Sequence, residues 1–318
     1  MTMDLLTIGD VSIDLYMKID EKEVVSNDLS GNSNKICFLH GSKIPVSHFE
    51  TSIAGNSLNV GVACSFLGLK TKIYTEIGDD ENGKRIISEL KDLGISTDLI
   101  FTNQDTPTNV HSVIISGGDR TIFSYHEKRH YKIKKWEQPK WIYYTSMGQG
   151  FEDFQLELID YLKNNPAVGL AFNPGTIQMK EGLEKMKNII KCTDILFLNT
   201  EEAVKLTNNM PLTELHKELH SLGAKMTVIT DGKNGASASD GINVTKVNAY
   251  SDKRPVVDKT GAGDAFSAGY LSAVHYGKGL REALAWGVVN SGMQIKEIGS
   301  IKGLCKREEL EKIVSDIS

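Results

Sequence analysis

Beyond its first hundred residues, the chain alternates short apolar runs with amphipathic stretches, and this alternation constrains its fold more than any other feature. The apolar runs are as short as strands buried on both faces of a parallel sheet usually are. They comprise residues 141–145, 169–172, 194–198 and 226–230. The stretches between them place their large apolar side chains on one helical face and end at glycines such as Gly223. The sequence therefore predicts an α/β fold with a mostly parallel central sheet.

The N-terminal third does not follow this alternation. Residues 10–53 contain no convincing helix and predict extended, partly exposed chain, with a polar stretch at 26–34 that is typical of a mobile loop. Residues 113–123 consist of two β-rich runs around a Gly-Gly-Asp turn, which predicts a hairpin. We therefore expect a small β-rich lid, formed by parts of 10–53 and 105–130, on a single α/β domain that spans residues 1–318.

Charge and composition exclude several classes of protein. The 318 residues carry 36 Lys and Arg against 41 Asp and Glu, and this net charge of −5 argues against nonspecific nucleic-acid binding. The chain has neither an apolar run of about 18 residues nor the start of a secretory signal. The four cysteines are scattered, and the histidines, His126 and His130 among them, lack metal-ligand spacing. We expect a cytoplasmic protein without nucleic-acid or membrane partners.

The most informative segment for function is residues 256–274, which predicts a strand, a tight glycine turn and a helix of small residues. Gly261 and Gly263 let backbone amides turn toward one point, and the positive end of the helix adds to them, so the turn can hold an anion. Asp264 would repel a phosphate there unless it takes a proton from the attacking group. On spacing alone, Asp264 is equally consistent with a first-turn acid that only stabilises the helix. The small residues favour the catalytic reading, because they let the helix pack deeply and aim its amino end at a cleft.

This segment resembles the C-terminal motif of the ribokinase family, the pfkB-type carbohydrate kinases, usually written Asp-Thr-Thr-Gly-Ala-Gly-Asp. Other segments resemble further motifs of that family, in the same order and over nearly the whole chain. They are residues 52–60, 77–83, 199–202 and 230–235. The resemblance implies a ribokinase-like three-layer α/β sandwich with a mostly parallel central sheet and a small β-rich lid. It also implies ATP-dependent transfer of the γ-phosphoryl group to a hydroxymethyl group of a sugar, sugar derivative or nucleoside.

The resemblance assigns the catalytic groups to the glycine turn. Asp264 is implied to be the base that accepts the hydroxyl proton. The backbone amides of Gly261, Ala262 and Gly263 are implied to stabilise the transferring phosphoryl group.

For the acceptor, the resemblance points to Asp14, Gly55 and Asn59 where the lid meets the body. Asn56 lies one turn before Asn59 on the same predicted helix and is expected to reach the same ligand. Carboxylate and amide groups can each engage two hydroxyls. Taken alone, Asp14 is also consistent with the end of a strand, and Asn59 with an exposed helical residue.

On the nucleotide side, the resemblance implies contacts to ATP from the 199–202 and 230–235 segments and from a late helix. The residues are Asn199, Glu202, Thr230, Gly232, Gly235 and Asn290. Glu202 is further implied to hold Mg²⁺ through water, since Mg²⁺ usually binds one or two carboxylates plus phosphates. Taken alone, Glu202 is better explained as a first-turn helix acid, and Asn290 equally well as an ordinary helical residue.

The family often binds a monovalent cation such as K⁺ beside the anion turn. The corresponding places in this sequence are Asp258, Thr260 and the loop at Gly299. Two positions depart from the family pattern. Ala54 replaces the first glycine of a pair and is less free to adopt positive φ, while Lys259 brings a long cation next to the expected phosphate site.

Two further expectations concern the molecule as a whole. Because the lid has extended edges that need cover, we expect lids from two subunits to pair in a homodimer. The alternative function is a catalytically inactive sugar- or nucleoside-binding protein of the same fold, which a fold alone does not exclude.

Overall fold

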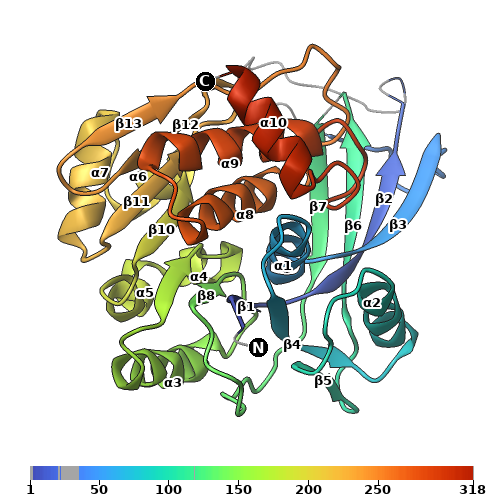
Figure 1. Ribbon diagram of the computed structural model, residues 1–318. Coiled ribbons are helices and arrows are strands. Elements are labelled where there is room, and N and C mark those ends of the chain that lie inside the picture. Colours follow the sequence, from blue (N-terminus) through green and yellow to red (C-terminus); the bar gives the residue numbers. More distant parts are fainter. Residues whose placement is uncertain (1–2, 21, 23–35, 118, 318) are drawn as a thin grey trace.

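The computed structural model describes residues 3–20, 22, 36–117 and 119–317, so the polar stretch at 26–34 lies outside the described residues. Its largest element is a nine-stranded sheet in the order β13-β12-β11-β10-β9-β8-β1-β4-β5 (Figure 1). The strands are β1 (Leu5–Ile8), β4 (Thr71–Gly78), β5 (Ile100–Asn103), β8 (Trp141–Tyr144), β9 (Gly169–Phe172), β10 (Ile195–Asn199), β11 (Met226–Thr230), β12 (Ala236–Ser239) and β13 (Val244–Val247). From β11 to β5 the strands run parallel, whereas β12 and β13 continue the sheet antiparallel. The mostly parallel sheet predicted from the short apolar runs is confirmed.

Helices cover both faces of this sheet (Figure 1). One face carries α1 (Asn56–Phe66), α2 (Glu81–Asp92), α8 (Ala262–His275), α9 (Leu280–Gln294) and α10 (Arg307–Ile317). The other face carries α3 (Phe151–Asn164), α4 (Thr176–Glu181), α5 (Leu183–Ile190), α6 (Thr200–Leu206) and α7 (Leu212–Ser221). The result is a three-layer sandwich.

Alternate side chains of the buried strands lie in the two halves of the core. Leu5 and Phe197 pack with the helices of the first face, whereas Leu6 and Leu198 pack with those of the second. All four side chains are at most 2% exposed. Because successive side chains of a strand point to opposite faces, a strand covered on both faces must be apolar throughout, as the short runs are.

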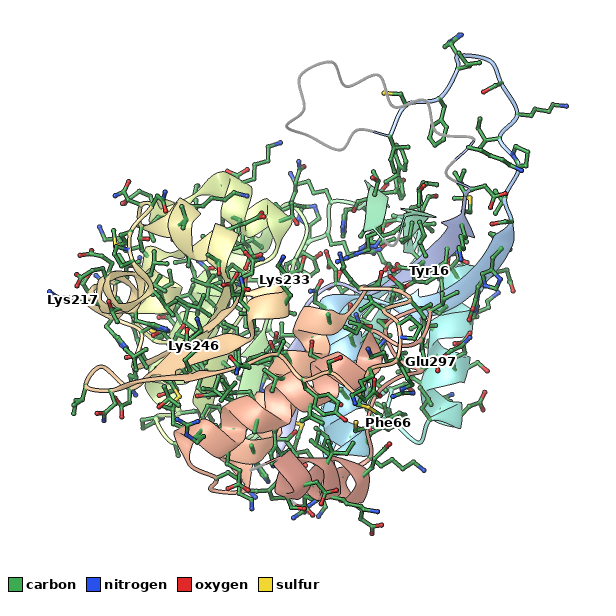
Figure 2. All side chains as sticks on the ribbon, turned by 90° about the horizontal axis from the view of Figure 1, so that it is seen from above. Tyr16, Phe66, Lys217, Lys233, Lys246 and Glu297 are labelled. Atoms are coloured by element: carbon green, nitrogen blue, oxygen red, sulfur yellow. The ribbon has the colours of Figure 1, made fainter. Side chains whose placement is uncertain are left out.

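A second, four-stranded sheet has the order β3-β2-β6-β7 and forms the lid. Its strands are β2 (Ser12–Lys18), β3 (His48–Ala54), β6 (Asn109–Ser116) and β7 (Asp119–Tyr125). β6 and β7 form the predicted antiparallel hairpin, and β2 lies between β3 and β6. In Figure 2 the lid strand that carries Tyr16 stands well apart from α7, which carries Lys217. The predicted β-rich lid beside an α/β body is confirmed.

One local prediction is wrong. Residues 256–258 precede the glycine turn as extended chain outside both sheets, not as a strand. Val257 donates its backbone N–H to the carbonyl of Ile295, just after α9, at 2.9 Å. Val256 and Val257 are 45% and 37% exposed, because this segment lies on the end of a helix and not between strands.

Among the described residues, no helix is both long enough and apolar enough to cross a membrane.

Candidate active site

The glycine turn begins α8. Gly261 is the N-cap of α8 and has a φ of +74°, a conformation that glycine adopts without strain. A Cβ atom at Gly261 would lie 2.6 Å from Cβ of Ser300, so a larger residue would also clash there. Gly263 is exposed, and a Cβ atom there would meet nothing within 4 Å. The turn therefore opens to solvent at the positive end of a 14-residue helix, where an anion is stabilised. Ala262 donates its backbone N–H to the carbonyl of Lys259 at 3.3 Å.

Asp264 follows Gly263 in the first turn of α8 and is only 6% exposed. Its two carboxylate oxygens accept hydrogen bonds from two amides of α1. Asn59 Nδ2 donates to Oδ2 at 2.7 Å, and Asn56 Nδ2 donates to Oδ1 at 3.0 Å. Ser300 Oγ in turn donates to Oδ1 of Asn59 at 2.7 Å, which orients that amide. Asp264 is therefore held in a fixed position at the junction of α1 and α8.

Burial raises the pKa of Asp264 to about 6, against the hydrogen bonds from Asn59 and Asn56, which lower it. Arg120 of β7 also lowers this pKa through its positive charge, whereas Asp14 of β2 raises it. The lid thus contributes charges of both signs to the surroundings of Asp264. A carboxyl whose pKa is near 6 is ionised at neutral pH and accepts a proton more readily than an ordinary aspartate.

The structure brings the residues predicted for the acceptor to the junction of lid and body. Asp14 lies in the middle of β2, is 4% exposed, and accepts from Ser12 Oγ at 2.9 Å and from Tyr16 OH at 3.2 Å. Gly55 is the N-cap of α1 with a φ of +114°. A Cβ atom there would lie 2.5 Å from the carbonyl oxygen of Asp10, so Gly55 permits the close approach of α1 to the chain after β1.

The nucleotide-side residues lie at the ends of β10 and β11. Asn199 and Glu202 form a reciprocal cap of α6: Glu202 donates its N–H to Asn199 Oδ1 at 2.8 Å, and Asn199 donates its N–H to Glu202 Oε2 at 2.9 Å. Burial raises the pKa of Glu202. Thr230 ends β11 in register with Asn199, which places the two loops side by side. Gly232 (φ +49°) begins the short 3₁₀ helix Gly232–Asn234.

Two residues of the nucleotide set have packing roles in this structure. A Cβ atom at Gly235 would lie 2.0 Å from the carbonyl oxygen of Val247, so only glycine fits between the 3₁₀ helix Gly232–Asn234 and β13. Asn290 is fully buried; it donates to the carbonyl of Ala265 at 2.8 Å and accepts the N–H of Cys305 at 3.1 Å. Both polar atoms of this amide therefore join α9 to neighbouring backbone.

Asp258 connects the segment before the turn with the loop at Gly299. Its Oδ1 accepts the N–H and the hydroxyl of Thr260 at 2.9 and 2.7 Å, and its Oδ2 accepts the N–H of Gly299 at 3.0 Å. Asp258 is 2% exposed, and these three donors are neutral. The arrangement leaves a buried negative charge beside the N-terminus of α8.

The structure describes both residues that depart from the family pattern, Ala54 and Lys259. Ala54 ends β3, is 1% exposed and has ordinary negative φ, so the strand itself supplies the conformation that this position needs. Lys259 is exposed on the turn before α8.

The structure adds residues to this region that the motifs did not indicate. His111 of β6 and His126 after β7 join Asp14 and Asp10 between lid and body. Asp10 is 3% exposed and accepts a hydrogen bond from Tyr131 OH. The spacing of these residues along the chain carries no signal, since strand register alone brings them together. Among the described residues, no cluster of three or more His, Cys, Asp or Glu side chains is arranged to hold a metal ion.

A family model described as pfkB family carbohydrate kinase matches residues 14–307. The matched region contains both Asp14 of the lid and the turn that ends in Asp264. The chain belongs to this family. Among the relatives, an ATP-dependent 6-phosphofructokinase of Thermoanaerobacterium thermosaccharolyticum is 25% identical over 318 residues, or 95% of this chain and 90% of the relative. The ribokinase of Bacillus subtilis is 24% identical over 319 residues, covering 98% and 99% of the two chains.

Solved structures of a nucleoside kinase and of ribokinases have the same fold. A nucleoside kinase of Methanocaldococcus jannaschii, an archaeal member of the ribokinase family, superposes with a TM-score of 0.80 over 99% of both chains at 17% identity. The ribokinase of Arabidopsis thaliana, complexed with ribose and ATP, gives a TM-score of 0.79 at 19% identity, again over 99% of both chains. The ribokinase-like fold expected from the motifs is confirmed.

Proposed function

We propose that this chain transfers the γ-phosphoryl group of ATP to a hydroxymethyl group of a sugar, sugar derivative or nucleoside. The observation that carries the proposal is the buried Asp264, held by Asn56 and Asn59 beside a glycine turn that is open to solvent. A carboxylate with a raised pKa beside an anion-stabilising helix end suits a base that deprotonates a hydroxyl as it attacks a phosphoryl group. Membership in the pfkB family supports the same reaction.

In the proposed mechanism, Asp264 accepts the hydroxyl proton while the acceptor oxygen attacks the phosphoryl group. The amides at Gly261, Ala262 and Gly263 and the positive end of α8 stabilise the charge that develops on the phosphoryl oxygens. The amide of Ala262 is shared with the carbonyl of Lys259. The lid covers the acceptor and excludes water, which suppresses hydrolysis of ATP.

Asp14 binds hydroxyl groups of the acceptor from the lid side, opposite the face formed by Gly55, Asn56 and Asn59. Asn56 and Asn59 also position Asp264 through the hydrogen bonds described above. Relatives of this chain act on sugars, sugar phosphates and nucleosides, as a ribokinase, a 6-phosphofructokinase and a nucleoside kinase show by their names. We therefore place the acceptor within these classes.

ATP lies across the ends of β10 and β11, with its phosphates near Thr230 and the 232–235 loop. Two ribokinase structures, complexed with ATP and with ADP, support the choice of nucleotide. Asn199 orients Glu202, whose carboxylate would hold Mg²⁺ through water. One carboxylate suits this ion, because Mg²⁺ keeps most of its waters and binds the phosphates themselves. Bound Mg²⁺ supplies positive charge to the transferring phosphoryl group.

Asp258, Thr260 and the loop at Gly299 would hold a monovalent cation such as K⁺. The donor set fits, because Asp258 is a buried anion whose three described hydrogen-bond donors are neutral. A cation there would stabilise the turn that begins at Gly261, which packs against Ser300. At constant ionic strength, we expect K⁺ to raise both the melting temperature of the protein and the rate of phosphoryl transfer. If tetramethylammonium raises both equally, the cation site is excluded.

We also propose that two copies of the chain pair through the lid. The lid exposes large apolar side chains on its outer strands: Phe49 is 61%, Ile122 44%, Phe123 62% and Tyr125 50% exposed. Such side chains on edge strands favour association. We expect sedimentation to give twice the mass of one chain and Phe123→Asp to halve it; a monomeric wild-type protein would exclude the dimer.

The test of the proposed function is ADP release from Mg·ATP across a panel of sugars, sugar acids, sugar phosphates and nucleosides. We expect one acceptor to be strongly preferred. If no acceptor supports turnover but one of them raises the melting temperature and Mg·ATP does not, the chain is instead a binding protein of the same fold.

A further inference from the structure

A pair of histidines lies between the lid strand that carries Asp14 and the body. His111 of β6 and His126, just after β7, approach through their Nε2 atoms at 3.2 Å. The two rings are 17% and 23% exposed, and their centroids lie 4.9 Å apart. The parallel register of β2 with β6 pairs Asp14 with His111, so the pair lies directly beside the proposed acceptor carboxylate. Tyr16, which is labelled in Figure 2, lies two residues after Asp14 on β2.

The hydrogen bonds at the outer end of the pair determine the tautomer of His126. Asn109 is fully buried, and its Oδ1 accepts the N–H of Glu127 at 3.0 Å. This bond fixes the orientation of the amide, so that Nδ2 of Asn109, a donor, faces Nδ1 of His126 at 3.3 Å. Nδ1 of His126 must then be unprotonated, and the ring carries its proton on Nε2.

The hydrogen bonds at the inner end determine the tautomer of His111 independently. Nδ1 of His111 lies 3.2 Å from Asp14 Oδ1 and 3.3 Å from Ser12 Oγ. Ser12 gives its single hydroxyl proton to Asp14 at 2.9 Å, so both neighbours of Nδ1 can only accept. His111 therefore carries a proton on Nδ1. One proton is then needed between the two Nε2 atoms, and His126 supplies it.

We propose that Asn109, His126 and His111 form a directional hydrogen-bond chain that positions Asp14 for the acceptor. The proposal rests on the proposed function, because it assigns the acceptor to Asp14. Each member donates to the next: Asn109 to His126, His126 to His111, and His111 to Asp14. In this arrangement both rings are neutral, and His111 and His126 are positioning residues.

The chain also defines what Asp14 can bind. Its Oδ1 accepts from Ser12 and His111, whereas Oδ2 accepts only the hydroxyl of Tyr16, at 3.2 Å, among the described residues. Because a carboxylate oxygen has about two lone-pair positions, Oδ2 has room for one more donor. The ligand group at this position is therefore a hydrogen-bond donor such as a hydroxyl, and a ligand with an ether or a carboxylate in its place is rejected.

Two carboxylates face the pair from neighbouring elements. Asp14 of β2 faces His111, and Asp10, after β1, lies 3.6 Å from Nδ1 of His126. Tyr131 donates to Oδ1 of Asp10, whereas Oδ2, the oxygen nearer to His126, has no hydrogen-bond partner among the described residues. Tyr16 donates to Asp14, and Tyr125 donates to Glu127. A second proton on His126 would pair with Asp10 but would meet the N–H of Asn109.

The first test reads the tautomers directly and needs neither acceptor nor ATP, so it is independent of the proposed function. In protein labelled with ¹⁵N-histidine, two-bond ¹H–¹⁵N spectra at neutral pH distinguish protonated from unprotonated ring nitrogens. We expect the proton on Nε2 of His126 and on Nδ1 of His111, with assignments from His111→Gln and His126→Gln. Any other pattern in either ring overturns the proposal.

The second test reverses the chain. Asn109→Asp keeps the acceptor for Glu127 but can no longer donate to His126, whose Nδ1 then takes the proton. His111 is left with an unprotonated Nδ1 against Asp14. We expect the KM for the preferred acceptor of the panel, such as D-ribose or uridine, to rise about tenfold or more, with the KM for Mg·ATP unchanged.

Matched variants separate positioning from folding. Asn209→Asp makes the same change on an exposed loop and should leave both KM values as in the wild type. His111→Leu should raise the acceptor KM, and His111→Asn should recover part of the loss, because its amide nitrogen can occupy the place of Nδ1. An unchanged acceptor KM in Asn109→Asp, or an equal rise in both KM values, would contradict a positioning role.

Discussion

At the scale of single residues, the central feature is a carboxylate that is both buried and fixed. Asp264 exchanges the hydration of its charge for two amide hydrogen bonds, and the exchange is incomplete, because its pKa stays raised to about 6. Asn59 is fixed by Ser300 in turn, so the orientation of Asp264 depends on residues outside the glycine turn. A base with few rotamers available loses little entropy when it acts, which favours proton transfer.

The raised pKa of Asp264 predicts how the rate depends on pH. Because a base acts only when it is ionised, we expect kcat/KM for the acceptor to fall about tenfold per pH unit below about 6 and to level off above it. Asn56→Ala should move this limb to higher pH, because it removes a hydrogen bond that lowers the pKa. Initial rates between pH 5 and 8 provide the measurement. A limb that stays in place in Asn56→Ala would argue against Asp264 as its origin.

At the scale of elements, the site is built by close backbone approaches and caps. Gly55 brings the N-terminus of α1 onto the chain after β1, and Gly261 begins α8 beside the loop at Ser300. Both glycines have positive φ. Together they aim two helix N-termini at the junction of lid and body, where Asp264 meets Asn56 and Asn59.

We expect Gly55→Ala to destabilise the fold strongly. The new Cβ atom would combine a φ of +114° with a contact of 2.5 Å to the carbonyl oxygen of Asp10. Gly94→Ala is the matched control, because Gly94 has a φ of +73° with nothing within 4 Å of such a Cβ. Urea unfolding should show a loss of about 1–2 kcal/mol for the control and about 1–3 kcal/mol more for Gly55→Ala. Equal losses would mean that the contact with Asp10 is easily relieved.

The packing of α7 on the sheet predicts a dependence of stability on pH. His216 is 1% exposed, with Nδ1 2.7 Å from Thr227 Oγ1 and Nε2 2.9 Å from Ser237 Oγ, and burial lowers its pKa to about 4. Between its unfolded value of 6.5 and about 4, the unfolded chain therefore binds more protons than the folded one, so stability is lost as the pH falls through this range.

The loss from His216 amounts to at most about 3 kcal/mol. His216→Gln does not titrate, so its free energy of unfolding should change less between pH 7 and 5 than that of the wild type. Urea titrations at the two pH values measure this difference. The same change in both proteins would show that His216 does not contribute.

At the scale of the whole molecule, the sequence predicted the parts that local patterns encode. The buried strands, the hairpin and the glycine turn at Asp264 follow from apolar runs and glycines within a few residues of one another. The reciprocal cap of Asn199 and Glu202 was also readable, since a polar N-cap three residues before an acid is a local pattern. In contrast, the contacts among His111, His126 and Asp10 depend on the register of β2 with β6 and on the place of the lid, which no local pattern records. The hydrogen bonds of Asn290 were not predictable for the same reason, because its partners lie on α8 and at Cys305.

The arrangement of lid and body predicts that the protein hydrolyses ATP only slowly when no acceptor is bound. The pKa of Asp264, the proposed base, depends on the lid, because Arg120 lowers it and Asp14 raises it, both from lid strands. We expect ADP release from Mg·ATP without acceptor to be a small fraction of the acceptor-dependent rate. A basal rate as high as the rate with acceptor would indicate an ATP hydrolase instead.

The most direct test of Asp264 as the base compares Asp264→Asn with Asp153→Asn in the same phosphoryl-transfer assay. Both aspartates are the third residue of a 14-residue helix, but Asp153 is exposed at the start of α3, away from the glycine turn. With a base at position 264, kcat should fall by about 10²- to 10⁴-fold in Asp264→Asn and stay unchanged in Asp153→Asn, while both variants keep the melting transition of a folded protein. A folded Asp264→Asn variant with wild-type turnover would contradict the account.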